Sequence, residues 1–306
     1  MIAALVANIV LPVILAPLLP GVINRVKAVA AGRRGQPLLQ LYYDIWKLLH
    51  KGAVYSRTTS WVFRAGPMVT LAAVLTASLA VPLGRSPAPL HFAGDLVLVA
   101  YLLGLGRFLT VLAALDTGSA FEGMGASREV TFSALAEPAL LLGLAALARL
   151  TNSISLTDIL AALTWGTWSA SAAELALVAA AVLIVFLAEN ARIPVDDPNT
   201  HLELTMIHEV MVLDHGGPDF AFILYGSAMK LWVLGAILVQ ILVPGGAGGY
   251  LTRLAACLAG MLGVAVVVGV VESVMARLRL LRVPQLLAAA GAFAVLALVL
   301  ALRRAG

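Results

Sequence analysis

The feature that most constrains this chain is a series of apolar stretches, each about as long as a bilayer is thick. A membrane-spanning helix needs about 20 apolar residues, and eight stretches meet this requirement: 2–24, 67–83, 94–116, 130–149, 171–190, 219–243, 252–275 and 284–302. Only 12% of the residues are charged, whereas soluble domains have about 25%. The sequence therefore predicts an all-α, polytopic membrane protein in which residues 1–306 form a single integral domain within the lipid bilayer.

The first candidate span differs from the others because it contains Pro12, Pro17 and Pro20. Proline removes a backbone donor and disturbs a helix, so we expect a kink or a tilt in this span. No Lys or Arg precedes the span, and the first basic residue is Arg25. A secretory signal carries positive charge before its apolar stretch, so we interpret residues 2–24 as an uncleaved first span.

The distribution of basic residues predicts which side of the membrane each loop faces. Thirteen of the 20 Lys and Arg residues fall in the loops after the first, third, fifth and seventh spans, and five fall on the opposite side. Positively charged loops face the cytoplasm, so both termini are predicted to lie outside. The formal net charge of +4 is explained in the same way and gives no reason to expect a nucleic-acid partner.

Two of the predicted cytoplasmic loops, residues 25–66 and 191–217, contain helical patterns. Within 37–51, apolar residues recur on one helical face, while Asp44, Lys47 and Lys51 lie on the other. This pattern predicts an amphipathic helix at the membrane surface or against a partner protein. Within 200–213, an apolar stripe and a stripe of His, Thr and Glu residues predict a second helix of this kind.

The stretch AENARIPVDDPNTHLELTMIHE, at 188–209, places six charged residues directly after a very apolar span. Glu189 and Arg192 are three residues apart, which is the spacing of an ion pair on one helical face. A T-x-x-E capping box offers a structural explanation of Glu203 and of the aspartates before it. His201 and His208 are seven residues apart and do not form the H-E-x-x-H zinc pattern, so no metal site is expected.

Further ionisable residues lie within the apolar spans or at their ends. Glu137, Arg107 and Lys230 fall well inside spans, although snorkelling to the membrane surface is an alternative explanation of the two cations. Charges at this depth are costly unless they are paired or protonated. Burial raises a carboxyl pKa and a neighbouring cation lowers it, so a buried row of acids can titrate near neutral pH. We therefore hypothesise a proton relay composed of Asp116, Glu129, Glu137, Glu189 and Lys230.

These residues also resemble a known family. Respiratory complex I and membrane-bound hydrogenases share a membrane subunit, called subunit 1 in complex I, that has an A-E-x-N-R-x-P-x-D loop. A similar frame is present in this chain and is matched by Glu189, Asn190, Arg192, Pro194, Asp196, Glu203 and Leu204. The stretches VDDPNTHLELTMIHE, LDTGSAFEGMGASRE and GRRGQPLLQLYYDIWKLLHK more closely resemble the hydrogenase branch of this family. That branch comprises hydrogenase-4 component C, formate hydrogenlyase subunit 4 and the corresponding membrane subunit of energy-converting hydrogenases. The similarity covers nearly the whole chain.

The resemblance implies a non-catalytic subunit of a membrane-bound nickel–iron hydrogenase in the cytoplasmic membrane of a bacterium or an archaeon. Loops 25–66 and 191–217 would dock a peripheral arm that contains the hydrogenase large and small subunits and an iron–sulfur subunit. The implied interface residues are Arg128, Arg192, Asp196, Asp197, Glu203, His208 and Glu209. The buried acids would continue towards antiporter-like membrane subunits that move H+ or Na+.

The expected cofactors belong to the partner subunits. This chain has one cysteine, Cys257, whereas an iron–sulfur cluster needs about four ligands, so no cluster is expected in the chain itself. The resemblance further implies that the chain binds no redox cofactor. The corresponding complex I cavity takes a quinone headgroup, but departures from the complex I motifs put quinone binding in doubt. Three alternatives remain: a quinone-site subunit of a complex I-type enzyme, a stand-alone transporter, and a passive anchor. The transporter alternative is disfavoured because no repeated halves are visible.

Overall fold

The computed structural model describes residues 2–84, 86–196, 206–244 and 248–305, and the regular elements in these ranges are all helices. Seven of them are long and apolar enough to cross a bilayer, and a bent helix pair at the N-terminal end brings the number to eight if the pair counts as one span. The seven are α4 (Trp61–Ala80), α5 (Asp95–Asp116), α6 (Ala120–Thr151), α9 (Ala172–Glu189), α10 (Gly217–Leu242), α11 (Tyr250–Val274) and α12 (Val283–Ala305). The predicted all-α membrane fold is therefore confirmed.

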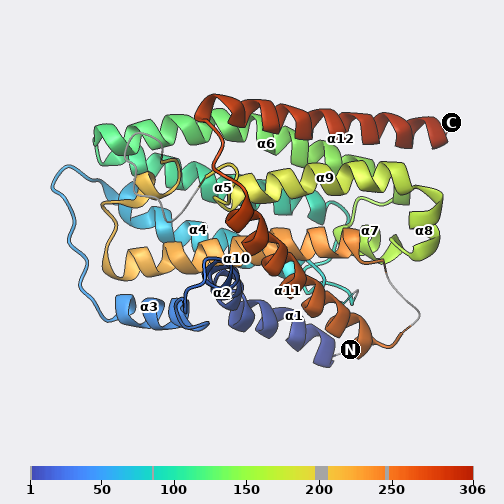
Figure 1. Cartoon of the computed structure of the whole chain (residues 1–306), viewed down its shortest axis with the longest axis horizontal. Coiled ribbons are helices and arrows are strands. Elements are labelled where there is room, and N and C mark those ends of the chain that lie inside the picture. Colours follow the sequence, from blue (N-terminus) through green and yellow to red (C-terminus); the bar gives the residue numbers. More distant parts are fainter. Residues whose placement is uncertain (1, 85, 197–205, 245–247, 306) are drawn as a thin grey trace.

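The long helices run along the long axis of the molecule, except that α11 crosses the others obliquely (Figure 1). Both termini lie at one end of the bundle, at the right of the view. The short helix α3 (Gln40–Leu49) and the start of α10 lie towards the opposite end. Both termini are expected at the same end when the number of membrane crossings is even, because each crossing reverses the direction of the chain.

The bend predicted in the first span is present. The chain forms α1 (Ile2–Leu15) and α2 (Leu18–Ala30), which meet at an angle of 44°. Pro17 lies at the break and has no N–H to donate to the carbonyl of Val13. The hydroxyl of Tyr225 donates to that carbonyl at 2.8 Å, and the hydroxyl of Tyr42 donates to the carbonyl of Ile14. Side chains from α10 and α3 thus supply hydrogen bonds that the broken helix lacks.

The two loop helices predicted from amphipathic patterns have different outcomes. The first is confirmed as α3, which keeps none of its residues buried and exposes Tyr43 and Trp46. The second, 200–213, falls partly outside the described residues. Its described part, 206–213, contains only a 3-10 turn, η1 (Glu209–Val212), and not the predicted α-helix. The reason is that Val210 and Met211 are buried between helices, so packing determines the backbone there.

A second correction concerns residues 117–129, which were expected to form a loop. Most of this segment is the first part of α6, so Arg128 and Glu129 project from a helix. The glycines within the first part of α6 do not end the helix. Gly125 is instead a position where another segment of the chain packs closely against α6. A Cβ on Gly125 would lie 2.3 Å from Val210 Cγ1 and 2.9 Å from the carbonyl oxygen of Ile207. The absence of a side chain at Gly125 lets segment 206–213 lie directly on α6.

The bundle is closed by α12, which packs against α6 and α9. Its buried residues are Val283, Leu287, Ala290, Ala294, Ala297 and Ala301. They recur every three or four residues and are mostly alanine, so one narrow stripe of small side chains faces the bundle. Two short helices, α7 (Leu156–Ala162) and α8 (Trp165–Ala170), connect α6 to α9 and are not predicted by the apolar pattern of the sequence.

Candidate functional site

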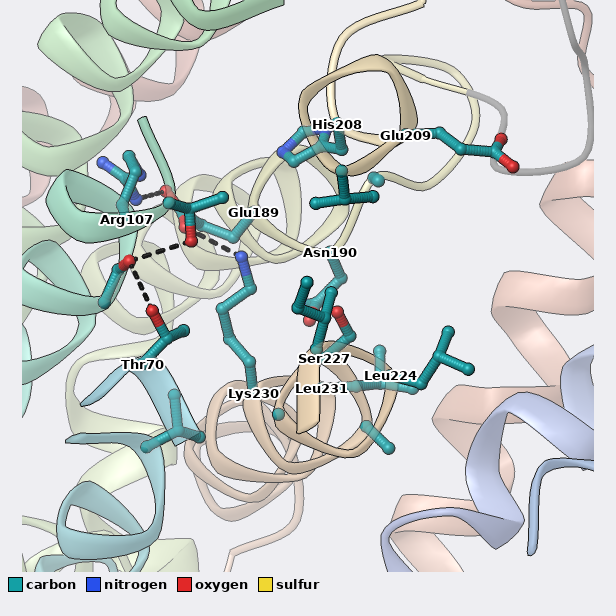
Figure 2. A pocket seen from close by; sticks show the side chains of 18 of the residues that line it. Thr70, Arg107, Glu189, Asn190, His208, Glu209, Leu224, Ser227, Lys230 and Leu231 are labelled. Carbon is teal, nitrogen blue, oxygen red and sulfur yellow. Dashed lines mark hydrogen bonds and ion pairs between the residues drawn. The ribbon is translucent and has the colours of Figure 1, made fainter. Parts of the chain in front are cut away.

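Ionisable side chains from four spanning helices meet around Arg107, near the middle of α5 (Figure 2). The neighbouring residue, Gly106, lets α5 approach α4 closely. The Gly106 carbonyl accepts a hydrogen bond from Thr70 Oγ1 at 3.0 Å, and a Cβ on Gly106 would lie 3.3 Å from Thr70 Cγ2. This close helix contact helps to fix the rotation of α5 and directs Arg107 towards α6 and α9.

Arg107 pairs with three carboxylates. Its Nε lies 3.1 Å from Glu129 Oε1, and its two terminal nitrogens pair with Glu137 and Glu189. The side chains of Arg107, Glu129 and Glu189 are 9%, 7% and 6% exposed, whereas that of Glu137 is 48% exposed. A planar guanidinium presents several donors in fixed directions. One arginine can therefore hold acids from α6 and α9 in a single cluster.

Lys230 adds a second cation to this cluster from α10. Its Nζ lies 3.7 Å from Glu189 Oε2. In Figure 2, Arg107 and Lys230 point towards Glu189 from different sides, whereas Glu209 points away from it. Because Glu189 is the last residue of α9, its carboxylate lies where the spanning helix passes into the loop. The cluster therefore joins the middle of the bundle to the end that carries loop 191–217.

His208 extends the cluster into that loop. Its Nε2 lies 3.1 Å from Glu129 Oε2, and its Nδ1 lies 3.2 Å from Asp196 Oδ2. Asp196 also pairs with Arg277, with 2.8 Å between Oδ1 and the arginine nitrogen. Burial lowers the pKa of His208, but the carboxylates of Glu129 and Asp196 outweigh it, so the pKa lies above the ordinary histidine value. Burial raises the pKa of Asp196, but His208 and Arg277 outweigh it and lower that pKa.

The net charge of this network depends on whether His208 is protonated. Among the described residues, the ion pairs given above join three Lys or Arg side chains, four carboxylates and His208. The formal charges sum to −1 when His208 is neutral and to zero when it is protonated. An uncompensated charge is costly in a low-dielectric interior. The group therefore favours the protonated form of His208.

A second ionic contact lies beside the first. Glu272, near the end of α11, has a side chain with no exposed surface, and its Oε2 lies 2.8 Å from Lys27 Nζ of α2. Its Oε1 lies 3.5 Å from Arg192. The predicted pair of Glu189 with Arg192 is therefore wrong: Glu189 pairs with Arg107 and Lys230. The reason is that α9 ends at Glu189 and Ala191 adopts a positive φ of 51°, so Arg192 leaves the helical register.

A cavity of about 350 Å³ lies next to the network. Arg107, Glu129, Glu189, Lys230 and His208 contribute to its wall, and apolar residues of α10 such as Leu224 and Leu231 line another part (Figure 2). The buried Oδ1 atom of Asn190, which also lines the cavity, has no hydrogen-bond partner among the described residues. The cavity therefore has both the polar groups and the volume to hold water or a small polar group.

The other predicted site residues lie outside this network or outside the described residues. Asp116 accepts a hydrogen bond from the backbone N–H of Ser60 at 2.6 Å, at the start of α4, and is not brought to Arg107. Arg128 donates to the carbonyl of Met206 at 2.8 Å. Glu209 lines the cavity. Asp197 and Glu203 lie outside the described residues. Residues Arg192 and Asp196, predicted at a partner interface, are buried within the chain.

Four charged residues of these contacts are not among the site residues predicted from the sequence: Arg107, Lys27, Glu272 and Arg277. The position of Arg107 within an apolar span was a usable signal, because a charge at that depth is rarely left unpaired. The other three lie near predicted span ends, where charged residues are common. Only the packing of α2, α11 and loop 191–217 brings them together.

Comparisons with known proteins agree with this architecture. The sequence profile of the NADH dehydrogenase family matches residues 2–302. Formate hydrogenlyase subunit 4 of Escherichia coli (strain K12) is 33% identical over 290 residues, which cover 93% of each chain. Hydrogenase-4 component C of the same organism is 33% identical over 281 residues, which cover 90% of this chain and 88% of the relative.

A solved structure extends the comparison to the fold. It is a chain of the membrane-bound sulfane sulfur reductase, described as an archaeal respiratory membrane complex. The TM-score is 0.82 at 24% sequence identity, and the match covers 96% of both chains. The whole helical arrangement is therefore shared with a protein whose sequence has diverged widely.

Proposed function

Because this chain belongs to the NADH dehydrogenase family of complex I subunit 1-like membrane proteins, we propose that it is the membrane-anchoring, proton-coupling subunit of a membrane-bound nickel–iron hydrogenase. It is a multi-pass membrane protein with relatives among hydrogenase-related membrane subunits. The similarity to these relatives over about nine-tenths of the chain supports the formate hydrogenlyase or energy-converting type.

The observation that carries the proposal is the continuous ionic path between Glu137, near the middle of α6, and Arg277, beside loop 191–217. Arg107 joins Glu137 and Glu189 to Glu129, and His208 joins Glu129 to Asp196, which pairs with Arg277. Structural ion pairs can be isolated, but a path with a titrating member at its centre can respond to a proton at either end. This continuity favours a relay over a passive anchor.

His208 is the member of this path best placed to pass a proton. Each ring nitrogen faces one carboxylate, that of Glu129 on one side and that of Asp196 on the other. An imidazole can accept a proton on one nitrogen and release another from the second nitrogen. If a docked partner moved the loop that carries His208, Glu129 would lose its contact with the imidazole, and the path would be interrupted there.

The proposed arrangement places loops 25–66 and 191–217 in the cytoplasm and both termini outside, in a bacterial or archaeal cytoplasmic membrane. The excess of Lys and Arg in those loops supports this orientation. The loops would dock the hydrogenase large and small subunits and the iron–sulfur subunit, which would hold the nickel–iron centre and the clusters. Antiporter-like membrane subunits would receive the signal from the buried acids.

The decisive experiment replaces Glu189 by Gln in the intact complex, reconstituted in vesicles. Glutamine keeps the shape of the side chain but cannot titrate or balance Arg107 and Lys230. We expect hydrogenase turnover with a soluble electron donor to continue while ion movement across the vesicle membrane is lost. A pH-sensitive dye inside the vesicles, together with a Na+ measurement, reports that movement.

Glu174→Gln provides the matched control. Glu174 is a buried glutamate at the other end of the same helix, α9, where it lies 3.6 Å from Arg304. The control variant should keep ion movement. If Glu189→Gln also retained full coupled movement, the carboxylates would be structural and the chain would be an anchor.

A second candidate function is the quinone-site subunit of a complex I-type oxidoreductase, and the cavity is the observation that favours it. Its volume of about 350 Å³ falls within the range of small-molecule sites. Its wall combines apolar side chains of α10 with Asn190 Oδ1, which has no partner within the described part of the chain and can accept a hydrogen bond. Electron transfer that requires added quinone, and that Asn190→Leu abolishes, would support this function.

A further inference from the structure

Helix α11 presents a stripe of apolar side chains to its surroundings. Only 28% of its most apolar part is buried in the chain, compared with 67% for α10. Residues four apart in a helix lie on one face. The exposed side chains of α11 recur at this spacing, at Leu262, Val266, Val270 and Val274, with Val267 beside them. These five residues, called the α11 stripe below, form one continuous apolar surface.

The α11 stripe has the length of one leaflet of a bilayer. From Leu262 to Val274 the helix rises about 18 Å, at about 1.5 Å per residue. The hydrocarbon core of a bilayer is about 30 Å thick, so one leaflet supplies about 15 Å. Because α11 crosses the bundle obliquely (Figure 1), the depth that the stripe covers is somewhat shorter than its length. The stripe therefore fits the acyl chains of one leaflet, with Val274 close to the headgroups.

Exposed arginines follow the α11 stripe directly. Segment 273–284 contains three arginines and no carboxylate. Arg277 belongs to the ionic network described above, whereas the side chains of Arg279 and Arg282 are exposed. Leu281, which lies between these two, is 88% exposed. A membrane surface favours this combination, because the apolar side chain can enter the hydrocarbon while the cations stay with the headgroups.

Helix α2 adds a further arginine at this depth. It packs against the end of α11, where Lys27 Nζ lies 2.8 Å from Glu272 Oε2. In Figure 1, α2 and the turn between α11 and α12 lie at about the same position along the bundle. Arg25 of α2 is exposed, and its guanidinium donates a hydrogen bond to the carbonyl of Arg34. This bond limits the movement of a cation that lies at the level where the α11 stripe ends.

We infer that the end of the α11 stripe is a binding site for an anionic phospholipid, whose phosphate is held by Arg279 and Arg282 and whose acyl chains lie on the stripe. A guanidinium pairs closely with phosphate oxygens. A zwitterionic lipid is a weaker match, because its headgroup also carries a positive charge that the arginines repel.

Protein partners match one part of this surface each. A peripheral protein could pair with the arginines, but it would not reach a stripe at membrane depth. An apolar helix could cover the stripe, but it would leave the arginines without a counter-charge. A molecule that is both anionic and acylated complements the two parts together.

The test is photo-crosslinking in vesicles that contain equal amounts of phosphatidylglycerol and phosphatidylcholine. The intact complex is reconstituted with a photoreactive benzoylphenylalanine at Val274, which is 80% exposed and is the stripe residue nearest to the arginines in sequence. The reference probe is placed at Leu296, which is 49% exposed near the middle of α12. Mass spectrometry of the adducts gives the ratio of the two lipids at each position.

We expect phosphatidylglycerol to be enriched at Val274 relative to Leu296 by about tenfold, because each cation near a membrane surface attracts anionic lipid. Arg279→Gln combined with Arg282→Gln should lower the ratio at Val274 to that at Leu296. Arg279→Lys combined with Arg282→Lys should keep most of the enrichment, because the charges remain. Both side chains are exposed, so these substitutions leave the packing of the bundle intact.

The matched control removes two exposed arginines from the opposite end of the bundle, through Arg149→Gln and Arg303→Gln. The enrichment at Val274 should persist in this variant. Equal lipid ratios at Val274 and Leu296 before any substitution, or the same loss in both glutamine variants, would overturn the inference. So would an adduct of Val274 with another polypeptide, because a protein would then cover the stripe. The measurement does not involve ion movement, so its outcome is separate from that of the proposed function.

Discussion

At the scale of single residues, the network is organised by one arginine and made responsive by one histidine. Arg107 compensates Glu129, Glu137 and Glu189 at the same time. A lysine could not present three donors in the same fixed geometry. His208 has the different role of a titrating link, because it contacts one carboxylate of α6 and one of loop 191–217. The first residue holds the cluster together, and the second can change its charge.

The raised pKa of His208 leads to a prediction about pH. Its folded-state pKa lies above the ordinary value of 6.5, so its contribution to stability is fully present below about pH 6.5 and is lost as the pH rises through the folded-state pKa. We expect His208→Gln to lower the melting temperature of the purified complex more at pH 6 than at pH 9. Thermal unfolding of both proteins across this range measures the difference.

His215→Gln is the control for this experiment. Burial lowers the pKa of His215, and the ring stacks on Phe63 with 3.9 Å between the centroids, so it is neutral near pH 7. Replacing His215 should change the melting temperature, but the decrease should not be larger at pH 6 than at pH 9. An equal effect of His208→Gln at both pH values would show that His208 is not charged in the folded protein.

At the scale of elements, the network depends on the close approach of segment 206–213 to α6. This segment carries His208, and it can reach Glu129 because Gly125 offers no side chain. A Cβ there would come closest to Val210, to the backbone of Ile207 and to Met211. A glycine in a helix interior normally weakens the helix, so its presence here is explained by packing.

Gly125→Ala should therefore displace segment 206–213 and lengthen the contact between His208 and Glu129. Overpacking of this kind costs about 1–3 kcal/mol, and we expect both lower stability and reduced ion coupling. Gly123→Ala is a matched control on the same helix, because nothing lies within 4 Å of its Cβ position and alanine favours helix. Thermal unfolding and vesicle assays compare the two. Equal effects of the two substitutions would show that close packing at Gly125 is not what brings His208 to Glu129.

At the scale of the whole molecule, the arrangement of spans determines which groups can meet which partners. The bent pair α1–α2 counts as one crossing together with the seven long helices, and both termini lie at one end of the bundle (Figure 1). The proposed orientation follows from the positive charge of the loops at the opposite end. It places α3 and loop 191–217 on the side of a cytoplasmic arm.

This orientation predicts the outcome of cysteine labelling in intact cells. After Cys257→Ala, the chain has no other cysteine, so Ser56→Cys and Ser169→Cys can be labelled separately. Both serines are exposed. A membrane-impermeant maleimide should label Ser169→Cys from outside, and should label Ser56→Cys only after the cells are opened. The reverse result would invert the topology and place loop 191–217 outside.

What the sequence by itself determined is the set of properties that are local along the chain. Eight apolar stretches predicted the all-α membrane fold, the three prolines of the first span predicted the bend, and the pattern at 37–51 predicted α3. The length of an apolar run and the absence of a proline N–H act within one or two turns of helix. Such features can be read without knowing which helices are neighbours.

Only the tertiary structure decided which charges meet. Arg107 and Glu189 are 82 residues apart in sequence, and Glu272 pairs with Lys27 of α2 rather than with a residue near it in the chain. The three-residue spacing of Glu189 and Arg192 predicted a pair that does not form, because the helix ends between them. Ion pairing at membrane depth depends on the rotation and the depth of each helix against its neighbours, and these come from packing across the whole bundle.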